Sequence, residues 1–186
     1  MSEQSNSSTG PAPHRIEIKL RDINQLFNTM DPSPFHEKDL DDDAEEFIVS
    51  WAREFPISEP VILTIHLPAT CPVREPDPLI EAAVQHYFMY RAGIVRMEFH
   101  RLMREARQSL IIGLAFLTVC LVIAGLLGQH GPETVREVSQ EGLTIAGWVA
   151  MWRPLQMYLY DWWPVRRRWK ILNKLGRMKV EIHREG

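Results

Sequence analysis

The sequence predicts an α+β protein in which a small three-stranded cytoplasmic sheet with covering helices is joined to a two-helix transmembrane hairpin. Two observations carry this prediction. The run Ser109–Leu127 has 19 residues and no charge, which is enough for a helix to cross a hydrocarbon core of about 30 Å. Three short segments elsewhere in the chain alternate apolar and polar residues, as half-buried strands do.

The three alternating segments are Arg15–Leu20, Val61–Leu67 and Met178–His183. Each of them places its apolar side chains on one face. Because a sheet of two strands is only marginally stable and three strands with a helical cover are viable, we expect the third segment to return and pair with the first two. One domain is then built from both ends of the chain.

Helical spacing predicts two covering helices between the first two strands, at Arg21–Thr29 and Asp41–Phe55. The acids at the start of the second helix complement the positive end of its dipole. From Asp77 a long helix can continue without interruption to Gly128. That helix carries the apolar run.

The basic residues predict the orientation of the hairpin. They flank the two apolar regions: Arg91, Arg96, Arg101, Arg104 and Arg107 come before the first, and Arg166, Arg167, Arg168, Lys170, Lys174 and Arg177 follow the second. The intervening Gln129–Gly142 has one arginine and three glutamates. By the positive-inside rule both flanks, and therefore both termini, are cytoplasmic.

The second crossing, Leu143–Trp163, contains Arg153 near its middle, followed by Pro154 and later by Asp161. A charge at the bilayer centre costs about 2.5–3.5 kcal/mol on insertion scales. Either the segment is tilted or broken, so that Arg153 reaches the interface, or Arg153 and Asp161 form an intramembrane polar site. Eight residues on an ideal helix leave the two side chains about 80° apart, so we expect a direct pair within one helix to be poor and a partner on another subunit to be as plausible.

Aromatic residues lie within this segment, most of them toward its end, and basic residues follow it. We expect the aromatic side chains to form a belt at the inner interface: Trp152, Tyr158, Tyr160, Trp162 and Trp163. The cluster Arg166, Arg167, Arg168 and Lys170 both sets topology and suits contact with anionic lipid headgroups.

The expected organisation covers the whole chain. It comprises a disordered tail at residues 1–14, a cytoplasmic α+β domain with the long helix at 15–108, a first transmembrane helix at 109–128, an external loop at 129–142, a second, kinked transmembrane or partly interfacial helix at 143–164, and a basic cytoplasmic tail at 165–186 whose strand completes the sheet.

The sequence offers no motif that names a reaction. It has no Gly-rich phosphate loop, GxSxG or HExxH. The acid run from Asp39 lacks the glycine and glutamate of an EF-hand, because Ala44 and Ser50 stand at those positions. The seven histidines and two cysteines show no metal-ligand spacing. We therefore expect no metal and no cofactor. No basic face away from the bilayer indicates nucleic-acid binding.

The stretches Gly147–Leu155 and Leu159–Pro164, together with Asp31–Phe35 before an acidic helix, resemble a pattern found in uncharacterised bacterial two-pass inner-membrane proteins. The resemblance covers about a third of the chain. It implies a bacterial inner-membrane location and no activity.

Three functions remain open. The first is a membrane-anchored, non-enzymatic interaction, accessory or scaffold protein, whose cytoplasmic domain binds a protein partner or a second copy. The second is a small oligomeric ion or proton transport component that uses Arg153 and Asp161. The third is a membrane-surface enzyme acting on lipid. The absence of catalytic motifs favours the first.

Overall fold

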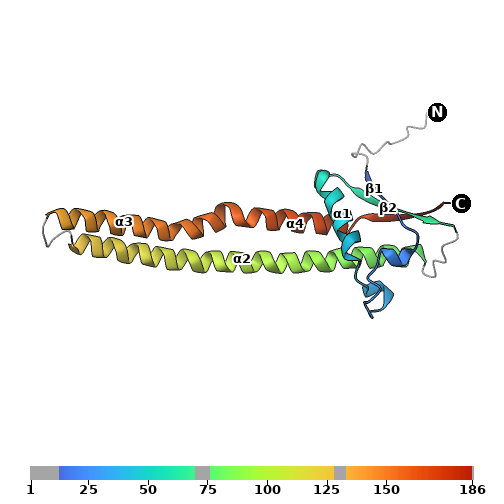
Figure 1. The fold of residues 1–186 in the computed structure, drawn as a ribbon, viewed down its shortest axis with the longest axis horizontal. Coiled ribbons are helices and arrows are strands. Elements are labelled where there is room, and N and C mark those ends of the chain that lie inside the picture. The colour runs from blue at the N-terminus through green and yellow to red at the C-terminus, as the bar shows by residue number, and fades with distance from the viewer. Residues whose placement is uncertain (1–12, 70–75, 128–132, 186) are drawn as a thin grey trace, which may run out of the picture. The chain divides into compact units, whose positions relative to one another are not determined.

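The structure is a computed structural model that describes residues 13–69, 76–127 and 133–185. It divides into two compact units, Met1–Ile94 with Arg168–Gly186, and Val95–Arg167. We call the first unit the sheet domain and the second the helix pair, and we describe each by itself (Figure 1). The predicted disordered tail lies almost wholly outside the described residues, and no statement about its structure follows.

The sheet domain contains a three-stranded sheet formed by the N-terminal part of the chain and its C-terminal segment. The strands are β1 (His14–Lys19), β2 (Val61–Pro68) and β3 (Lys179–Glu185), in the order β1-β2-β3. The prediction that the C-terminal segment joins the first two strands is confirmed. All pairs are parallel, an orientation that the alternating pattern did not indicate. The fold is thus α+β with a parallel sheet.

One face of the sheet forms the core of the domain. Ile16 on β1, Leu63 on β2 and Val180 on β3 lie side by side in register and are buried. Their neighbours two residues along, Ile18 and Ile65, are buried as well. The opposite face carries polar residues, most of them exposed. This pattern is unusual for parallel strands, because helices normally cover both faces of a parallel sheet.

Helix α1 (Asp42–Glu54) follows the acid run as predicted. The Asp41 carboxylate accepts a hydrogen bond from the Asp43 backbone N–H at 3.1 Å, which caps the helix. The helix ends before Phe55, whose extended backbone is what a following proline requires. Asp41 therefore serves as the helix cap, and Asp42, Asp43 and Glu45 lie in the first turn, next to the positive end of the helix dipole.

The predicted helix at Arg21–Thr29 is wrong in extent. Only the 3-10 turn η1 (Ile23–Gln25) forms there, closed by a capping box between Asp22 and Gln25. Phe27 then pairs with Leu40 in an isolated antiparallel bridge. This bridge draws the backbone out of helical geometry, so a tertiary contact overrides the local helical spacing. A second 3-10 turn, η2 (Phe35–Glu37), lies between the two bridge residues.

Helix α2 (Asp77–Leu127) is a single helix of 51 residues, as predicted. Within the described residues it is the one helix long and apolar enough to cross a membrane, judged by length and composition. Only 17% of its most apolar window is buried. A core helix of a soluble protein would be mostly buried there.

The second helical segment consists of α3 (Glu133–Gln156), the π-helix η3 (Met157–Asp161) and α4 (Trp162–Leu175). Helix α3 already begins at Glu133, so most of the segment expected to be an external loop is helical. Glutamate is a good helix former, so the polarity of this segment does not by itself predict a loop. The last turns of α4 belong to the sheet domain and bury Ile171, Leu172 and Leu175.

Candidate functional site

Within the helix pair, α2 and α3 run antiparallel and touch through two glycines (Figure 1). A Cβ placed on Gly147 of α3 would lie 2.5 Å from Cδ1 of Leu117 on α2. A Cβ placed on Gly113 of α2 would lie 3.1 Å from the carbonyl oxygen of Ala150. Further along, the Gln140 amide donates to the carbonyl of Ala124 at 3.2 Å. These contacts fix the register of the two helices.

That register places Arg153 near one end of the apolar run. Gly113 faces the stretch from Ala150 to Pro154, and Gly113 is only four residues, or about 6 Å, beyond Ser109, where the run begins. Arg153 had been expected near the middle of the second crossing. The pairing of the helices moves it toward the end of the run that adjoins the basic flank.

Arg153 forms an ion pair with Asp161 of the same chain, with Nη1 and Oδ2 3.6 Å apart. The two side chains thus come within ion-pair distance in one chain, closer than an ideal α-helix would bring them, and η3 accounts for the difference. A π-helical turn takes one residue more than an α-helical turn. Asp161 therefore lies where the seventh residue after Arg153 would lie in an α-helix, and residues seven apart share a face.

Pro154 lies inside α3, three residues before η3 begins. Proline has no N–H to donate, and its ring crowds the carbonyl four residues earlier, here that of Ala150. The helix continues through η3 instead of breaking. In the same stretch the Trp162 indole N–H donates to the carbonyl of Tyr158 at 2.7 Å, and the Arg166 guanidinium lies over the Trp162 ring, 5.6 Å from its centroid.

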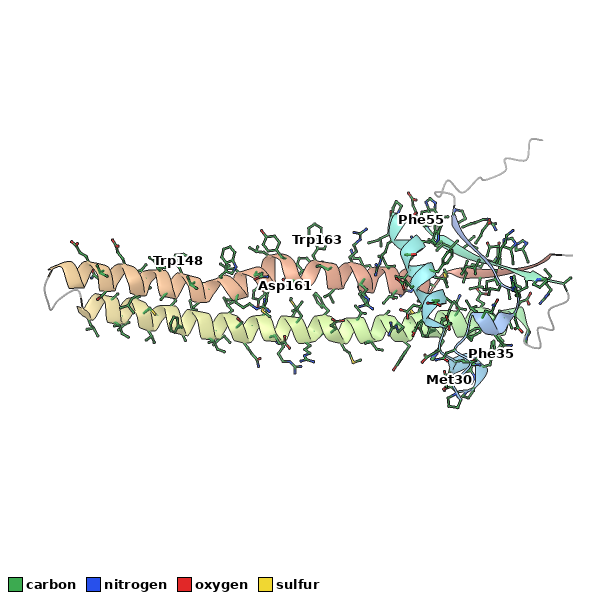
Figure 2. All side chains as sticks on the ribbon, viewed as in Figure 1. Met30, Phe35, Phe55, Trp148, Asp161 and Trp163 are labelled. Carbon is green, nitrogen blue, oxygen red and sulfur yellow. The ribbon has the colours of Figure 1, made fainter. Side chains whose placement is uncertain are left out.

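Large apolar side chains cover the outside of the helix pair. On α2 they include Ile112, which is 69% exposed, and Leu114. On α3 they include Trp148, which is 64% exposed, and Trp152. Figure 2 shows Trp148 and Trp163 projecting outward from the second helical segment. Both helices, and not α2 alone, therefore present an apolar surface to their surroundings.

The predicted aromatic residues lie on α3, η3 and the first turn of α4, and the predicted basic residues follow them on α4. Trp152, Tyr160 and Trp163 are exposed, and Tyr158 and Trp162 are half-buried. Arg166, Arg167, Arg168 and Lys170 all lie on α4 and are exposed. Their contacts with lipid remain predictions.

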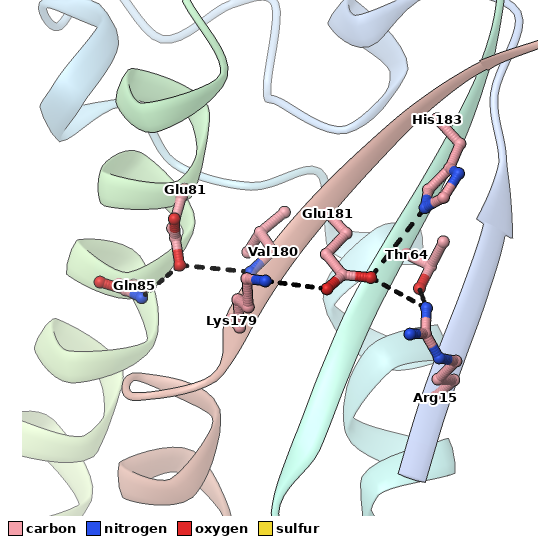
Figure 3. A network of polar contacts seen from close by, with 8 residues as sticks. All are labelled: Arg15, Thr64, Glu81, Gln85, Lys179, Val180, Glu181 and His183. Carbon is pink, nitrogen blue, oxygen red and sulfur yellow. Dashed lines mark hydrogen bonds and ion pairs between the residues drawn. The ribbon is translucent and has the colours of Figure 1, made fainter. Parts of the chain in front are cut away.

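A polar network occupies the outer face of the sheet (Figure 3). Arg15 Nη1 on β1 donates to Glu181 Oε2 on β3 at 2.9 Å, and its distance to the Thr64 hydroxyl on β2 is 3.5 Å. Lys179 Nζ donates to the other oxygen of Glu181 at 3.0 Å. The hydrogen bonds from Lys179 and Arg15 hold the pKa of Glu181 below its usual value.

The outer edge of β3 is covered by polar side chains of α2 (Figure 3). Glu81 accepts from the Val180 backbone N–H at 3.3 Å, and Gln85 donates to the Met178 carbonyl at 2.8 Å. An open strand edge invites pairing with other chains. These contacts satisfy part of the edge within the domain.

Helices α1 and α2 are joined by a half-buried cluster that the sequence did not reveal. The Tyr87 hydroxyl donates to the Glu45 carboxylate, and Arg91 Nη2 donates to it at 2.9 Å. Burial and the bond to Glu45 raise the pKa of Tyr87. Burial opposes the charge on Arg91, but the contacts with Glu45 outweigh it and raise its pKa. Glu45 thus acts as a structural anion, not a docking acid.

The histidines form no metal site in the part of the chain that the structure describes, where no group of three or more histidine, cysteine or acidic side chains is placed to hold an ion. His66 and His183 do pair in register on β2 and β3, with ring centroids 5.6 Å apart. Nε2 of His66 also lies 3.8 Å from Oε2 of Glu17. These residues belong to the polar sheet face.

Comparisons of the chain with protein-family models, curated proteins and solved structures found no match.

Two groups of residues in these contacts were not predicted from the sequence. Gly113 and Gly147 are visible in the sequence as small residues, but each faces larger side chains of the other helix, Gly113 the stretch from Ala150 to Pro154 and Gly147 Leu117 and Cys120, so their spacing did not reveal the register. The cluster of Glu45, Tyr87 and Arg91 left no such signal, because it joins segments more than 40 residues apart.

Proposed function

We propose that this protein is a membrane-anchored, non-enzymatic interaction protein with a transmembrane hairpin and a cytoplasmic domain that binds a protein partner. The observation that carries the proposal is the apolar outer surface of both helices in the helix pair. In water such a surface would be strongly unfavourable, at about 25 cal/mol for each Å² of apolar area. In a bilayer it is the expected outer surface.

The register of the two helices supports a hairpin whose second crossing begins and ends earlier in the chain than the expected segment Leu143–Trp163. Gln140 contacts Ala124 near one end of the apolar run, and Pro154 lies beside Gly113 near the other. The residues opposite the run, Ser109–Leu127, are thus roughly 137–155. The aromatic residues from Tyr158 onward then fall at the inner interface, followed by the arginines.

Arg153 fits an anchoring role in this arrangement. Close to the inner interface its long side chain reaches water, and Asp161 supplies a countercharge in the same chain. An ion pair lowers the free-energy cost of removing either charge from water, compared with that charge without a partner. It also requires no second subunit. The bacterial inner membrane, with both termini cytoplasmic, is the location we propose from the arginine asymmetry.

The polar face of the sheet is the surface that we assign to the partner. Arg15, Lys19 and Lys179 alternate there with Glu17 and Glu181. A face of this composition suits a polar, charged protein surface that docks through ion pairs and hydrogen bonds. The charge reversal Lys19→Glu should then weaken cross-linking of a photoreactive group on this face to the partner, whereas Arg53→Glu on α1 should leave it unchanged.

A second candidate function is ion or proton transport, favoured by the carboxylate of Asp161 and the guanidinium of Arg153 in the second helical segment. Proton flux into proteoliposomes separates the two functions. We expect no flux from the wild type, and Arg153→Lys should accumulate in the membrane normally, because one nitrogen makes the contact with Asp161 and lysine supplies one. Wild-type flux that disappears in both Arg153→Lys and Asp161→Asn would establish transport and overturn the anchoring role.

A further inference from the structure

The sheet domain has a basic groove beside the last turns of α4. Its volume is about 480 Å³. The segment Ile57–Val61 forms one wall, and the other wall is formed by Lys170, Asn173, Lys174 and Arg177. The three cations are spaced by four and three residues, so they lie on one face of the helix and of the turn that follows it.

Two of the groove cations, Lys170 and Arg177, form no ion pair with a carboxylate of the described residues, whereas several other basic residues of the domain do. Arg15, Arg91 and Lys179 each form an ion pair with a carboxylate. Among the described residues, neither Lys170 nor Arg177 has such a pair. The one carboxylate of the groove, Glu59, already contacts the His14 ring. An anion is therefore the ligand that the groove suits.

Lys174 is a second reason to expect an anion in the groove. Its Nζ donates to the carbonyl of Pro56 at 2.8 Å and is half-buried. Burial lowers the pKa of Lys174, and Glu59 only partly offsets this. A bound anion would stabilise the ammonium ion. The Ser58 hydroxyl and the Asn173 amide supply neutral hydrogen-bond donors in the same groove.

The groove also has an apolar part. In the sequence, its basic residues follow soon after the aromatic residues that we place at the inner interface. Ile57 is 40% exposed at the edge of the groove. Lys170 comes seven residues after Trp163, so the chain between them spans at most about 25 Å even when fully extended. Anionic headgroups are the phosphates available at that distance from the bilayer.

We propose that this groove binds the phosphate group of an anionic phospholipid of the membrane in which the protein is anchored. The inference rests on the membrane anchoring proposed above. Lys170, Lys174 and Arg177 hold the phosphate oxygens, Ser58 and Asn173 donate to them, and Ile57 contacts the apolar part of the lipid. This assigns the lipid contact to the far end of α4, beyond the arginines that set topology.

The test uses the full-length protein in neutral detergent, with the methyl resonance of Ile57 as the reporter. We expect dihexanoyl phosphatidylglycerol to shift this resonance saturably. In Lys170→Gln/Arg177→Gln the affinity should fall by about tenfold or more, since each cation near an anionic headgroup contributes about one factor of five. The matched control is Arg21→Gln/Arg53→Gln, which removes the same charge elsewhere on the domain and should bind like the wild type.

Three outcomes would overturn the inference. Equal loss in the control would mean that net charge and not the groove attracts the lipid. Inorganic phosphate binding as tightly as the lipid would make the ligand a soluble anion. No saturable shift would mean no site. Extraction of the wild type from membranes with alkaline carbonate is a separate measurement. A protein that stays in the membrane but shows no shift refutes the groove alone, whereas a released protein refutes the anchoring and the groove together.

Discussion

The two units of this chain place their apolar residues in opposite ways. In the sheet domain, Leu63 and Ile65 of the central strand are completely buried, and the exposed face carries charges. In the helix pair, Ile112 and Trp148 are exposed, and glycines lie at the helix contact. One domain hides apolar surface from its surroundings, and the other displays it. The difference is what the proposed membrane hairpin requires, with one unit in water and the other in lipid.

The contrast also shows how each unit is held together. The sheet domain gains its stability from apolar burial, which is favourable only in water. In lipid that driving force between helices is absent, and close packing of small residues takes its place. Gly113 and Gly147 are in the positions where such packing occurs. A variant in one unit should therefore alter the stability of that unit and leave the other unit unchanged.

Removing β3 should have the largest effect, and only on the sheet domain. Deletion of residues 177–186 removes the buried Met178 and Val180 and exposes one edge of β2. A two-stranded sheet is marginally stable, so residues 15–104 should become sensitive to limited proteolysis while the protein stays in the membrane fraction. Unchanged protease resistance of this region would contradict the role of β3 in closing the domain.

Filling the glycine contact should have a smaller effect, and only on the helix pair. In Gly147→Val the new side chain meets Leu117 and Cys120 of α2. Overpacking of this kind costs about 1–3 kcal/mol, so the melting temperature of the helix pair in detergent should fall. Gly142→Val is the matched control, because a Cβ at Gly142 has no neighbour within 4 Å among the described residues. Equal effects of the two variants would argue against the contact.

The smallest effect is expected at Glu181, in the polar sheet face. Its pKa is lowered from 4.5 by the bonds from Lys179 and Arg15. A lowered folded-state pKa means that the stabilisation is fully present above pH 4.5 and is lost as the pH falls through the folded-state value. Urea denaturation at pH 7 should therefore show Glu181→Gln to be slightly less stable than the wild type. The difference should shrink below pH 4.5, and a difference that grows there would have the wrong sign.

Much of the fold was predictable because its signals are local. Alternation marked the three strands, and an unbroken helical sequence marked α2 from Asp77. The parallel orientation of the strands was not predictable, since the alternating pattern is typical of antiparallel sheets with one open face. The helix expected at Arg21–Thr29 failed because the bridge between Phe27 and Leu40 is a tertiary contact.

The candidate site was predictable in its residues but not in its geometry. Arg153 and Asp161 stood out as charges in an apolar segment, yet their spacing argued against a pair in one helix. The π-helix η3 takes up one residue more than an α-helical turn and so changes the face on which Asp161 lies. A rule based on ideal helices cannot anticipate it.

The central claim is that the helix pair crosses the membrane as a hairpin with both chain ends on the cytoplasmic side. Single cysteines placed at residues 5, 129 and 185 of a variant without Cys71 and Cys120 test it directly in intact cells. A membrane-impermeant maleimide should label the cysteine at 129, and should label those at 5 and 185 only after the cells are opened. Labelling at 5 or 185 in intact cells would reverse the topology, and labelling at one end alone would show that only α2 crosses.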